Sequence, residues 1–266
     1  MIRLFLPPEQ ITGETASIRD NDHLHLTRVL RARPGDFVLL LDGKGNAFRA
    51  RLVSVEKHAT TAQIENAVRV PPEPPIFLTV GQALGKGDKF EQVIQHGTEA
   101  GASAFVPIHA ERSVVDIPVA KVADRVTRWR QIAKGAAEQS GRSRIAEVSA
   151  PQTVQESLRG AANDTPTLML HTDETTVGLR AALEGWSVPP ARLLLLVGPE
   201  GGWNPTEVAQ ARAAGALLVG LGPRILRTET AALVAISQIL YSMEIEHHAN
   251  SWPGWQSDTD RPPGFR

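Results

Sequence analysis

The sequence predicts an α/β protein with two domains: a small β-rich domain over residues 1–70 and a larger α/β domain over residues 76–248. The first part contains short alternating apolar segments with close turns, a pattern typical of a small β-barrel. The second part alternates apolar strand segments with helical apolar spacing, which is typical of a parallel sheet covered by helices on both faces. Four prolines within residues 71–75 favour an extended spacer between the two parts.

The predicted β-rich domain has a helix in its first half and turn signals between its strands. Residues 34–36 (Pro-Gly-Asp) and the glycine-rich residues 42–46 favour tight turns. Leu26, Val29 and Leu30 follow helical spacing, which predicts a short helix over residues 22–31. Strands are expected at residues 2–6, 37–41, 47–55 and 60–70.

The predicted α/β domain begins at residue 76, where the apolar period changes. Asn204, Pro205 and Glu207 form a strong helix-start signal, with a cap, a proline at the first position and a glutamate at the third. Gly101 is expected to end the first helix of this domain in a left-handed conformation. Strands are expected at residues 76–80, 103–108, 146–148, 167–171, 193–197 and 216–221. Helices are expected at residues 86–101, 119–140, 153–159, 177–183, after Asn204 and at 229–246, and a flexible tail at 249–266.

Composition narrows the class of protein. The 266 residues are 42% hydrophobic and 21% charged, which provides for a sizeable core and excludes global disorder. The absence of cysteine excludes disulfides, thiolate metal sites and cysteine nucleophiles, and fits a reducing cytoplasm. We expect neither a membrane span nor a signal peptide, and therefore a cytoplasmic protein. The formal net charge of −1 means that any nucleic-acid binding must use a local patch.

Two predicted strands end in glycine-bearing loops, at residues 198–202 and 222–224. Ligands bind beyond the carboxyl ends of strands in open α/β sheets, so a small-molecule pocket is expected there. The first loop matches neither the dinucleotide-binding fingerprint nor the P-loop. Glycines at such positions also serve simply as turn residues, but Arg224, Arg227 and Glu229 beside the second loop favour a site for an anion or a developing negative charge.

Two basic clusters are candidates for polyanion binding. Residues 121–144 hold seven basic and two acidic residues, a local net charge of +5, although a charged helix face is often only solvated. Arg28, Arg31 and Arg33 form the second cluster. His23 and His25 have the spacing of metal ligands, but no third ligand is suggested, and we interpret them as surface histidines.

The motifs GPEGGWNPTEV and LGPRILRTETAAL resemble the C-terminal signature of the SPOUT superfamily of RNA methyltransferases. They are most similar to the RsmE-type enzymes, which methylate N3 of a uridine in 16S rRNA. The similarity extends to residues 25–36, 86–99, 111–113 and 137–142, and leaves out only the tail after about residue 248.

This resemblance implies a fold, a cofactor and partners. It implies a PUA-like barrel that helps to hold RNA and an α/β domain whose last part forms a trefoil knot, where the strand pattern alone predicts an unknotted doubly wound sheet. It also implies a homodimer that acts on 16S rRNA or the 30S subunit, without a metal. S-adenosylmethionine would be bound in the knot by Leu170, His171, Thr172, Gly198, Pro199, Glu200, Gly201, Leu221, Gly222, Ile225, Leu226 and Arg227.

The chemistry of base methylation suggests roles for charged residues. Uracil N3 carries a proton at neutral pH, so the reaction needs a base or cationic stabilisation of the uracil anion. We expect Arg227 to stabilise that anion and Glu229 to position the base or remove its proton. RNA phosphates are expected along Arg28, Arg31, Arg33, Lys121, Arg125, Arg128 and Arg142. The alternatives are another SPOUT activity, such as ribose 2′-O-methylation, and a non-catalytic RNA-binding factor in ribosome assembly.

Overall fold

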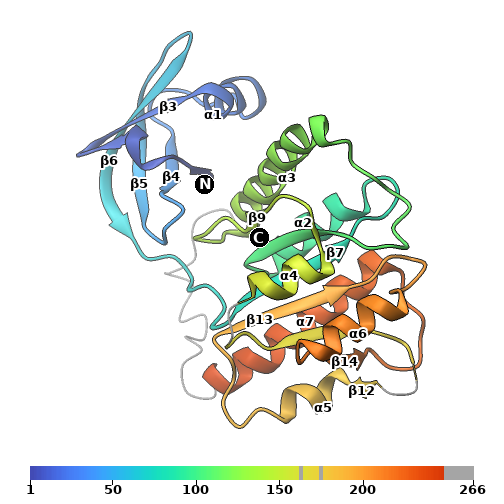
Figure 1. Cartoon of the computed structure of the whole chain (residues 1–266). Helices are drawn as coiled ribbons and strands as arrows, with labels where there is room; N and C mark the ends of the chain where they lie inside the picture. The colour runs from blue at the N-terminus through green and yellow to red at the C-terminus, as the bar shows by residue number, and fades with distance from the viewer. Residues whose placement is uncertain (162–163, 174–175, 249–266) are drawn as a thin grey trace. The chain divides into compact units, whose positions relative to one another are not determined.

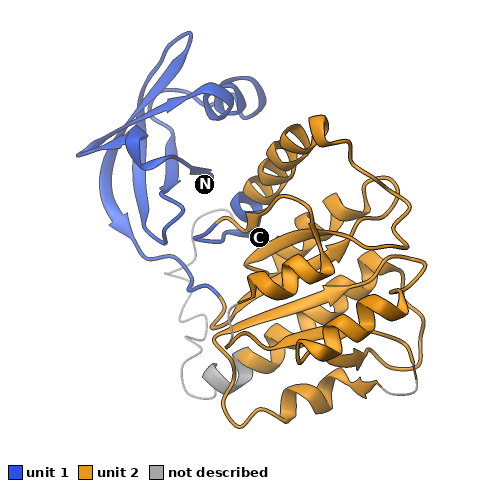
Figure 2. Cartoon of the chain, in the orientation of Figure 1, with its two compact units in different colours: residues 1–73, 137–144, 253–266 blue, residues 74–136, 145–252 orange. Residues whose placement is uncertain are grey.

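The computed structural model describes residues 1–161, 164–173 and 176–248 (Figure 1). The chain divides into two compact units (Figure 2). Unit 1 comprises Met1–Glu73 and Ala137–Arg144, and unit 2 comprises the described residues of 74–136 and 145–248. The predicted tail at 249–266 lies outside the described residues.

Unit 1 is built on a six-stranded mixed sheet in the order β1-β4-β5-β6-β3-β2. β1 pairs with β4 in parallel and the other pairs are antiparallel. The strands are β1 (Ile2–Phe5), β2 (Ile11–Thr12), β3 (Thr15–Arg19), β4 (Phe37–Leu41), β5 (Ala47–Val55) and β6 (Ala59–Val68). The sequence did not predict β2 and β3, because β2 has two residues and the inward positions of β3 are only Ala16 and Ile18.

The helical segment of unit 1 differs from the single helix that the apolar spacing predicts. A 3-10 turn, η1 (Pro8–Gln10), comes first; then α1 (Asp20–Leu24) passes directly into a π-helical turn, η2 (His25–Val29). The wider turn leaves Leu26 buried but Val29 and Leu30 65% and 40% exposed. The predicted apolar stripe is therefore wrong for its last two members, since the helix does not keep the period of 3.6 residues.

Residues 137–144 pack within unit 1 although they are distant from it in sequence. The Glu138 carboxylate accepts a hydrogen bond from the Phe5 N–H at 2.9 Å. Gly141 has φ +81°, which favours glycine, and the Arg3 guanidinium lies so close that it would have to move aside for a Cβ there. The Glu73 carboxylate accepts hydrogen bonds from the Arg142 side chain at 2.5 and 2.9 Å, and also from Ser143 and the Arg144 N–H.

Unit 2 is built on an eight-stranded sheet whose described pairs are all parallel, as the β–α alternation predicts. The order is β10-β8-β7-β13-β11-β14-β12, and β9 also pairs with β8. The strands are β7 (Phe77–Ala83), β8 (Ala104–His109), β9 (Glu147–Val148), β10 (Gln152–Thr153), β11 (Thr167–Leu170), β12 (Val177–Gly178), β13 (Arg192–Val197) and β14 (Leu217–Gly220).

Helices cover both faces of this sheet. Side chains from α2, α3, α5 and α7 join one apolar cluster, and side chains from α4 and α6 join the other. Their bounds are α2 (Lys89–Ala100), α3 (Val119–Ser140), α4 (Val154–Gly160), α5 (Leu179–Glu184), α6 (Pro205–Ala213) and α7 (Thr228–His248). Within the described part of the chain, no helix is long and apolar enough to cross a membrane.

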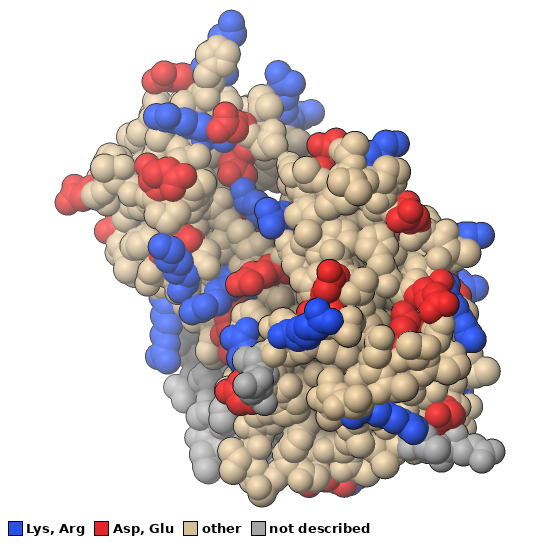
Figure 3. Space-filling view, in the orientation of Figure 1, with Lys and Arg blue, Asp and Glu red and all other residues tan. Residues whose placement is uncertain are grey.

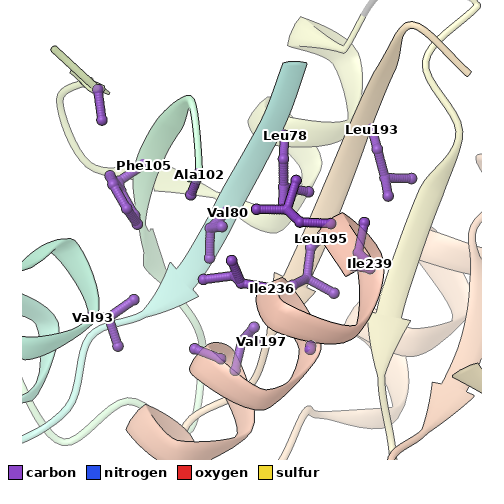
Figure 4. Close-up of a cluster of buried hydrophobic side chains, with 14 of the residues drawn as sticks. Leu78, Val80, Val93, Ala102, Phe105, Leu193, Leu195, Val197, Ile236 and Ile239 are labelled. Carbon is purple, nitrogen blue, oxygen red and sulfur yellow. The ribbon is translucent and has the colours of Figure 1, made fainter. Parts of the chain in front are cut away.

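The central strand β13 contributes to both apolar clusters because its side chains alternate between faces. Leu193, Leu195 and Val197 face the same cluster as Ile236 and Ile239 of α7, as Figure 4 shows, whereas Leu194 and Leu196 belong to the opposite cluster. The helix-end signals hold as well. Gly101 ends α2 with φ +110°, and Asn204 with Glu207 forms the expected capping box of α6.

Glu73→Gln is expected to destabilise unit 1. Burial raises the pKa of the Glu73 carboxyl, but the hydrogen bonds and charge of Arg142 and the bonds from Ser143 outweigh it, so the pKa is lowered. The contribution to stability is therefore present above the ordinary carboxyl pKa and is lost as pH falls through the lowered value. We expect the free energy of unfolding to fall by about 1.5–3 kcal/mol at pH 7.

Urea denaturation at pH 7 and at pH 3 measures this effect, with the exposed Glu9→Gln as control. Equal stability of wild type and Glu73→Gln at pH 7 would contradict it.

Candidate active site

Four loops of unit 2 meet at the carboxyl edge of its sheet. The chain passes from β7 to β8 on one side, while β13 lies on the other side of β7. Such a reversal of strand order opens a crevice at the strand ends. The loops at that edge are residues 84–88 after β7, 198–204 after β13, 171–176 after β11, of which 174–175 are not described, and 221–227 after β14.

A buried hydrogen-bond relay joins the end of β7, the loop after β13 and the first residue of α7. The Thr228 hydroxyl, at the first residue of α7, donates to the Gly198 carbonyl at 2.6 Å. The same hydroxyl accepts from the Gln82 side-chain amide at 2.8 Å. Gln82 is 1% exposed and also donates to the Ala83 carbonyl at 3.1 Å. The start of α7 is thereby fixed to the ends of β7 and β13.

Trp203 joins the loop after β13 to the end of β11. Its indole N–H donates to the Leu170 carbonyl at 3.1 Å, and the side chain is buried. A Cβ on Gly198 would lie 3.1 Å from the indole nitrogen, so glycine permits this close packing. The Pro199 carbonyl closes a tight turn by accepting from Gly202 N–H, and Gly202 has φ +70°.

The loops after β11 and β14 also lie against each other. The His171 N–H donates to the Val219 carbonyl at 3.0 Å, and the His171 ring lies 3.2 Å from the Asp173 carboxylate. A Cβ on Gly220 would lie 3.3 Å from the Thr176 hydroxyl oxygen. Gly222 has φ +98°, which a side chain would strain. Thr172 is exposed and Leu221 is half-buried.

Four charged side chains come together where these loops end. The Lys89 ammonium lies 2.5 Å from a Glu200 carboxylate oxygen and 3.8 Å from Glu229 Oε2. Glu200 raises the pKa of Lys89, and Lys89 in turn lowers the pKa of Glu200 mainly through their hydrogen bond. The positive charge of Arg227 lowers the pKa of Lys89 and so opposes the effect of Glu200.

The loop before α7 presents its other predicted residues to solvent. Ile225 is 94% exposed, Arg227 is exposed and Leu226 is half-buried. Glu229 is different, because its side chain is only 16% exposed. Its Oε2 atom is buried and has no hydrogen-bond partner among the described residues. The Lys89 ammonium lies 3.8 Å from this oxygen and is its charged neighbour.

The loop after β13 is also hydrogen-bonded to the loop after β8. The buried Glu207 carboxylate accepts from the Glu111 N–H at 2.9 Å and from the Asn204 N–H at 2.8 Å. The Asn204 side-chain amide bonds the Glu111 carboxylate, and the Arg112 guanidinium donates to the Gly201 carbonyl at 3.2 Å. The loop after β8 is therefore fixed to the glycine loop.

The predicted RNA-binding residues fall into three groups. Arg28, Arg31, Arg33 and Lys121 are exposed. Arg125 and Arg128 are also exposed, but both lie within 4 Å of the Glu91 carboxylate. The Arg142 side chain is only 9% exposed and pairs with Glu73, so it serves the packing of unit 1 and we leave it out of the proposed RNA surface.

Acidic and basic side chains are interspersed over the face that Figure 3 shows. The prediction of surface histidines is wrong for His23, which is 4% exposed with its Nδ1 2.9 Å from the Thr60 hydroxyl, while His25 is exposed. The described residues contain no group of three or more His, Cys, Asp or Glu that could hold a metal ion.

Sequence reasoning missed several residues that hold the site together. Lys89 and Arg112 lie in motifs that carry the family resemblance, but spacing gave them no partner. Thr228 and Trp203 adjoin the two glycine loops, and that adjacency was the available signal. Gln82 had no signal, because the predicted strand ended at residue 80, whereas β7 continues to Ala83.

Comparisons with known proteins identify the class. The model of the RNA methyltransferase domain matches residues 72–240, and that of the RNA methyltransferase PUA domain matches residues 18–65. The ribosomal RNA small subunit methyltransferase E of Synechocystis sp. is 37% identical over 89% of this chain and 76% of its own length.

Two solved structures are similar over most of their length. The ribosomal RNA small subunit methyltransferase E of Neisseria gonorrhoeae, bound to S-adenosyl methionine, has a TM-score of 0.82 and 36% identity, covering 91% of this chain and 97% of that one. A putative methyltransferase of Legionella pneumophila, in complex with the cofactor SAM, has a TM-score of 0.83 and 32% identity with the same coverage. The chain belongs to the RNA methyltransferase family, and within it to the RsmE type.

Glu200→Gln is expected to lower the midpoint of thermal unfolding near neutral pH. Because the folded pKa of Glu200 is lowered, its pair with Lys89 contributes above the ordinary carboxyl pKa. The contribution is lost as pH falls through the lowered value, so the difference between wild type and variant should shrink to nothing in acid. Calorimetry from pH 2 to pH 7 measures it, with the exposed Glu99→Gln as control; a pH-independent difference would count against the pair.

Proposed function

We propose that this protein is an S-adenosylmethionine-dependent methyltransferase that methylates N3 of a uridine in the 16S rRNA of the small ribosomal subunit. The observation that carries the proposal is the start of α7. There Thr228 fixes the helix to the glycine loop after β13, and the same segment presents Arg227 and Glu229. Family membership and the cofactor bound by the Neisseria gonorrhoeae relative support the cofactor and the substrate class.

The residues at the strand ends fit such a cofactor. Gly222 has φ +98° and nothing within 4 Å of a Cβ built on it, so its backbone is open to a ligand. The buried Gln82 Oε1 has no hydrogen-bond partner among the described residues, and the amino groups of S-adenosylmethionine are donors. We propose that the cofactor is held by Leu170, His171, Thr172, Gly198, Pro199, Glu200, Gly201, Leu221, Gly222, Ile225, Leu226 and Arg227.

The proposed reaction is an in-line displacement that needs alignment and charge stabilisation. S-adenosylmethionine supplies a methyl group from its sulfonium, whose C–S electron pair returns to sulfur as the N3–C bond forms. Glu229 accepts the N3 proton, because its carboxylate lies at this edge, is partly exposed and is held through Oε2 by the Lys89 ammonium at 3.8 Å. Arg227 is exposed at the same edge and stabilises the negative charge that develops on the uracil.

The finer features of fold and assembly are part of the proposal. We propose that residues 221–227 form the last thread of a trefoil knot. The strand order supports this proposal. β14 lies on the far side of β11 from β13, but α7, which follows β14 in the chain, packs against β7 and β13. We also propose a homodimer that acts in the cytoplasm. Ile225 and Tyr241 are large apolar side chains that are 94% and 69% exposed. Such exposure supports a surface near α7 that the second subunit would cover.

The RNA would contact basic side chains of both units. Arg28, Arg31 and Arg33 are candidates in unit 1, and Lys121, Arg125 and Arg128 are candidates in unit 2. Contacts of this type release counterions from the phosphate backbone. Binding should therefore weaken steeply as salt concentration rises.

Two measurements test the function. Calorimetry with S-adenosylmethionine separates an enzyme from a non-catalytic RNA-binding factor, which would not bind the cofactor. Methylation of isolated 30S subunits and of naked 16S rRNA, followed by nucleotide mapping, separates a base methyl from a ribose methyl. A product methylated at a ribose 2′-OH would replace the uridine-N3 assignment.

Arg227→Ala should lower kcat by about 10²–10³-fold, the usual loss when one stabilising donor is removed. Since Arg227 is exposed, the thermal midpoint should stay close to wild type. Arg227→Lys keeps the charge and should retain more activity than alanine. Single-turnover methylation of 30S subunits measures all three proteins; near-normal turnover of the alanine variant would refute the role.

Thr228→Val should weaken S-adenosylmethionine binding by about tenfold, because it leaves the Gly198 carbonyl and the Gln82 amide without their shared partner. Thr228→Ser keeps the hydroxyl and should bind as wild type does. Calorimetry gives both dissociation constants. Wild-type affinity in the valine variant would mean that the relay does not shape the cofactor site.

A further inference from the structure

We propose that Lys89 is a positioning residue for methyl transfer: Glu200 holds its ammonium, which in turn holds the Glu229 carboxylate at the reaction edge. This inference rests on the proposed function. Lys89 belongs to the motif at residues 86–89, and composition and spacing alone assign it no role.

Lys89 connects two helices and one loop that are far apart in sequence. It is the first residue of α2, whereas Glu200 lies 111 residues later in the loop after β13 and Glu229 is the second residue of α7. The ammonium is 2.5 Å from Glu200 and 3.8 Å from Glu229. The Lys89 ammonium thus lies between the Glu200 and Glu229 carboxylates, and both of these residues flank the proposed cofactor site.

The surroundings show that the pair is closely packed. A Cβ on Gly85 would lie 3.1 Å from the Glu200 Oε1 atom and 3.2 Å from the Lys89 Cδ atom, so glycine provides room for both side chains. The charged groups that act on Lys89 are Glu200, Glu229 and Arg227. Lys86 adds a second positive charge near Glu200.

The state of Glu229 indicates what Lys89 is for. At 3.8 Å the ammonium attracts Glu229 Oε2 without a hydrogen bond, and that buried oxygen has no donor among the described residues. The carboxylate is therefore held by charge on its buried Oε2 atom, while the side chain as a whole is still 16% exposed. In the proposed reaction the other carboxylate oxygen, which is not among the buried atoms without a hydrogen-bond partner, takes the N3 proton as the N3–C bond forms.

A purely structural ion pair would predict a different result. It would lower the thermal stability of every Lys89 variant and change cofactor binding and turnover together. A positioning role predicts a loss in kcat at saturating cofactor, with the dissociation constant for S-adenosylmethionine nearly unchanged. It also predicts that Lys89 and Glu229 act as a unit, so their losses do not multiply.

The test compares Lys89→Gln, Lys89→Arg and Glu229→Gln with Lys89→Gln/Glu229→Gln, and uses the exposed Lys57→Gln of unit 1 as the charge-removal control. Cofactor affinity comes from calorimetry and kcat from single-turnover methylation of 30S subunits. We expect Lys89→Gln to lower kcat by about tenfold or more and to change the cofactor dissociation constant by less than about twofold. Lys89→Arg should retain most activity, Lys57→Gln should match wild type, and the double variant should equal Glu229→Gln.

Near-normal kcat in Lys89→Gln, or multiplying losses in the double variant, would overturn the inference. If Lys89→Gln fails to fold, Glu200→Gln removes the carboxylate that holds the ammonium, and an unchanged kcat there would overturn the inference equally. Wild-type protein that methylates no rRNA would instead contradict the proposed function, which keeps the two failures distinguishable.

Discussion

The shared hydrogen bonds of the Thr228 hydroxyl are the constraint on which the arrangement of the site depends. This group accepts from Gln82 and donates to the Gly198 carbonyl in a buried setting, where an unpaired polar group is costly. It fixes the first turn of α7 at the ends of β7 and β13. Ile236 and Ile239 then continue the contact along the helix by packing against Leu195 and its neighbours. Apolar packing therefore holds the body of α7 against the sheet, and hydrogen bonds hold its first residue.

Around this fixed point, the loops are fastened by pairs of different chemistry. The indole of Trp203 ties the loop after β13 to β11 through a backbone carbonyl, and Glu207 ties it to the loop after β8 through backbone N–H groups. The connection to α2 uses a charge pair, Lys89 with Glu200, and the loop after β11 has another, Asp173 with Arg212 of α6. Charge pairs respond to a bound ion or a substrate charge, whereas neutral buried bonds do not. The edge nearest Arg227 and Glu229 is thus the part of the site that a charged substrate can influence.

The fold was largely predictable from the sequence, because long apolar segments record their own period. The strand at 193–197, the helix at 119–140 and the capping box at Asn204 all appear where the pattern places them. Errors arose where local geometry overrides periodicity, as in the π-helical turn at His25–Val29 and the two-residue strand β2. The site was predictable as two loops at strand ends, but its internal contacts were not. A contact such as Lys89 with Glu200 joins residues 111 positions apart, and no local pattern reports such a distance.

Carboxylates beside the basic residues at 121–144 change what their formal charge implies for the proposed RNA binding. The seven basic residues between 121 and 144 suggest a strong polyanion site, yet Glu91 lies beside Arg125 and Arg128, and Glu73 holds Arg142. An arginine that already faces a carboxylate must give up that partner, or share it, before it can neutralise a phosphate. Since the salt dependence of binding scales with the number of phosphates neutralised, this segment should contribute less than its formal charge implies. Under the proposed function, the exposed Arg28, Arg31 and Arg33 of unit 1 would then supply a larger share of the attraction to RNA.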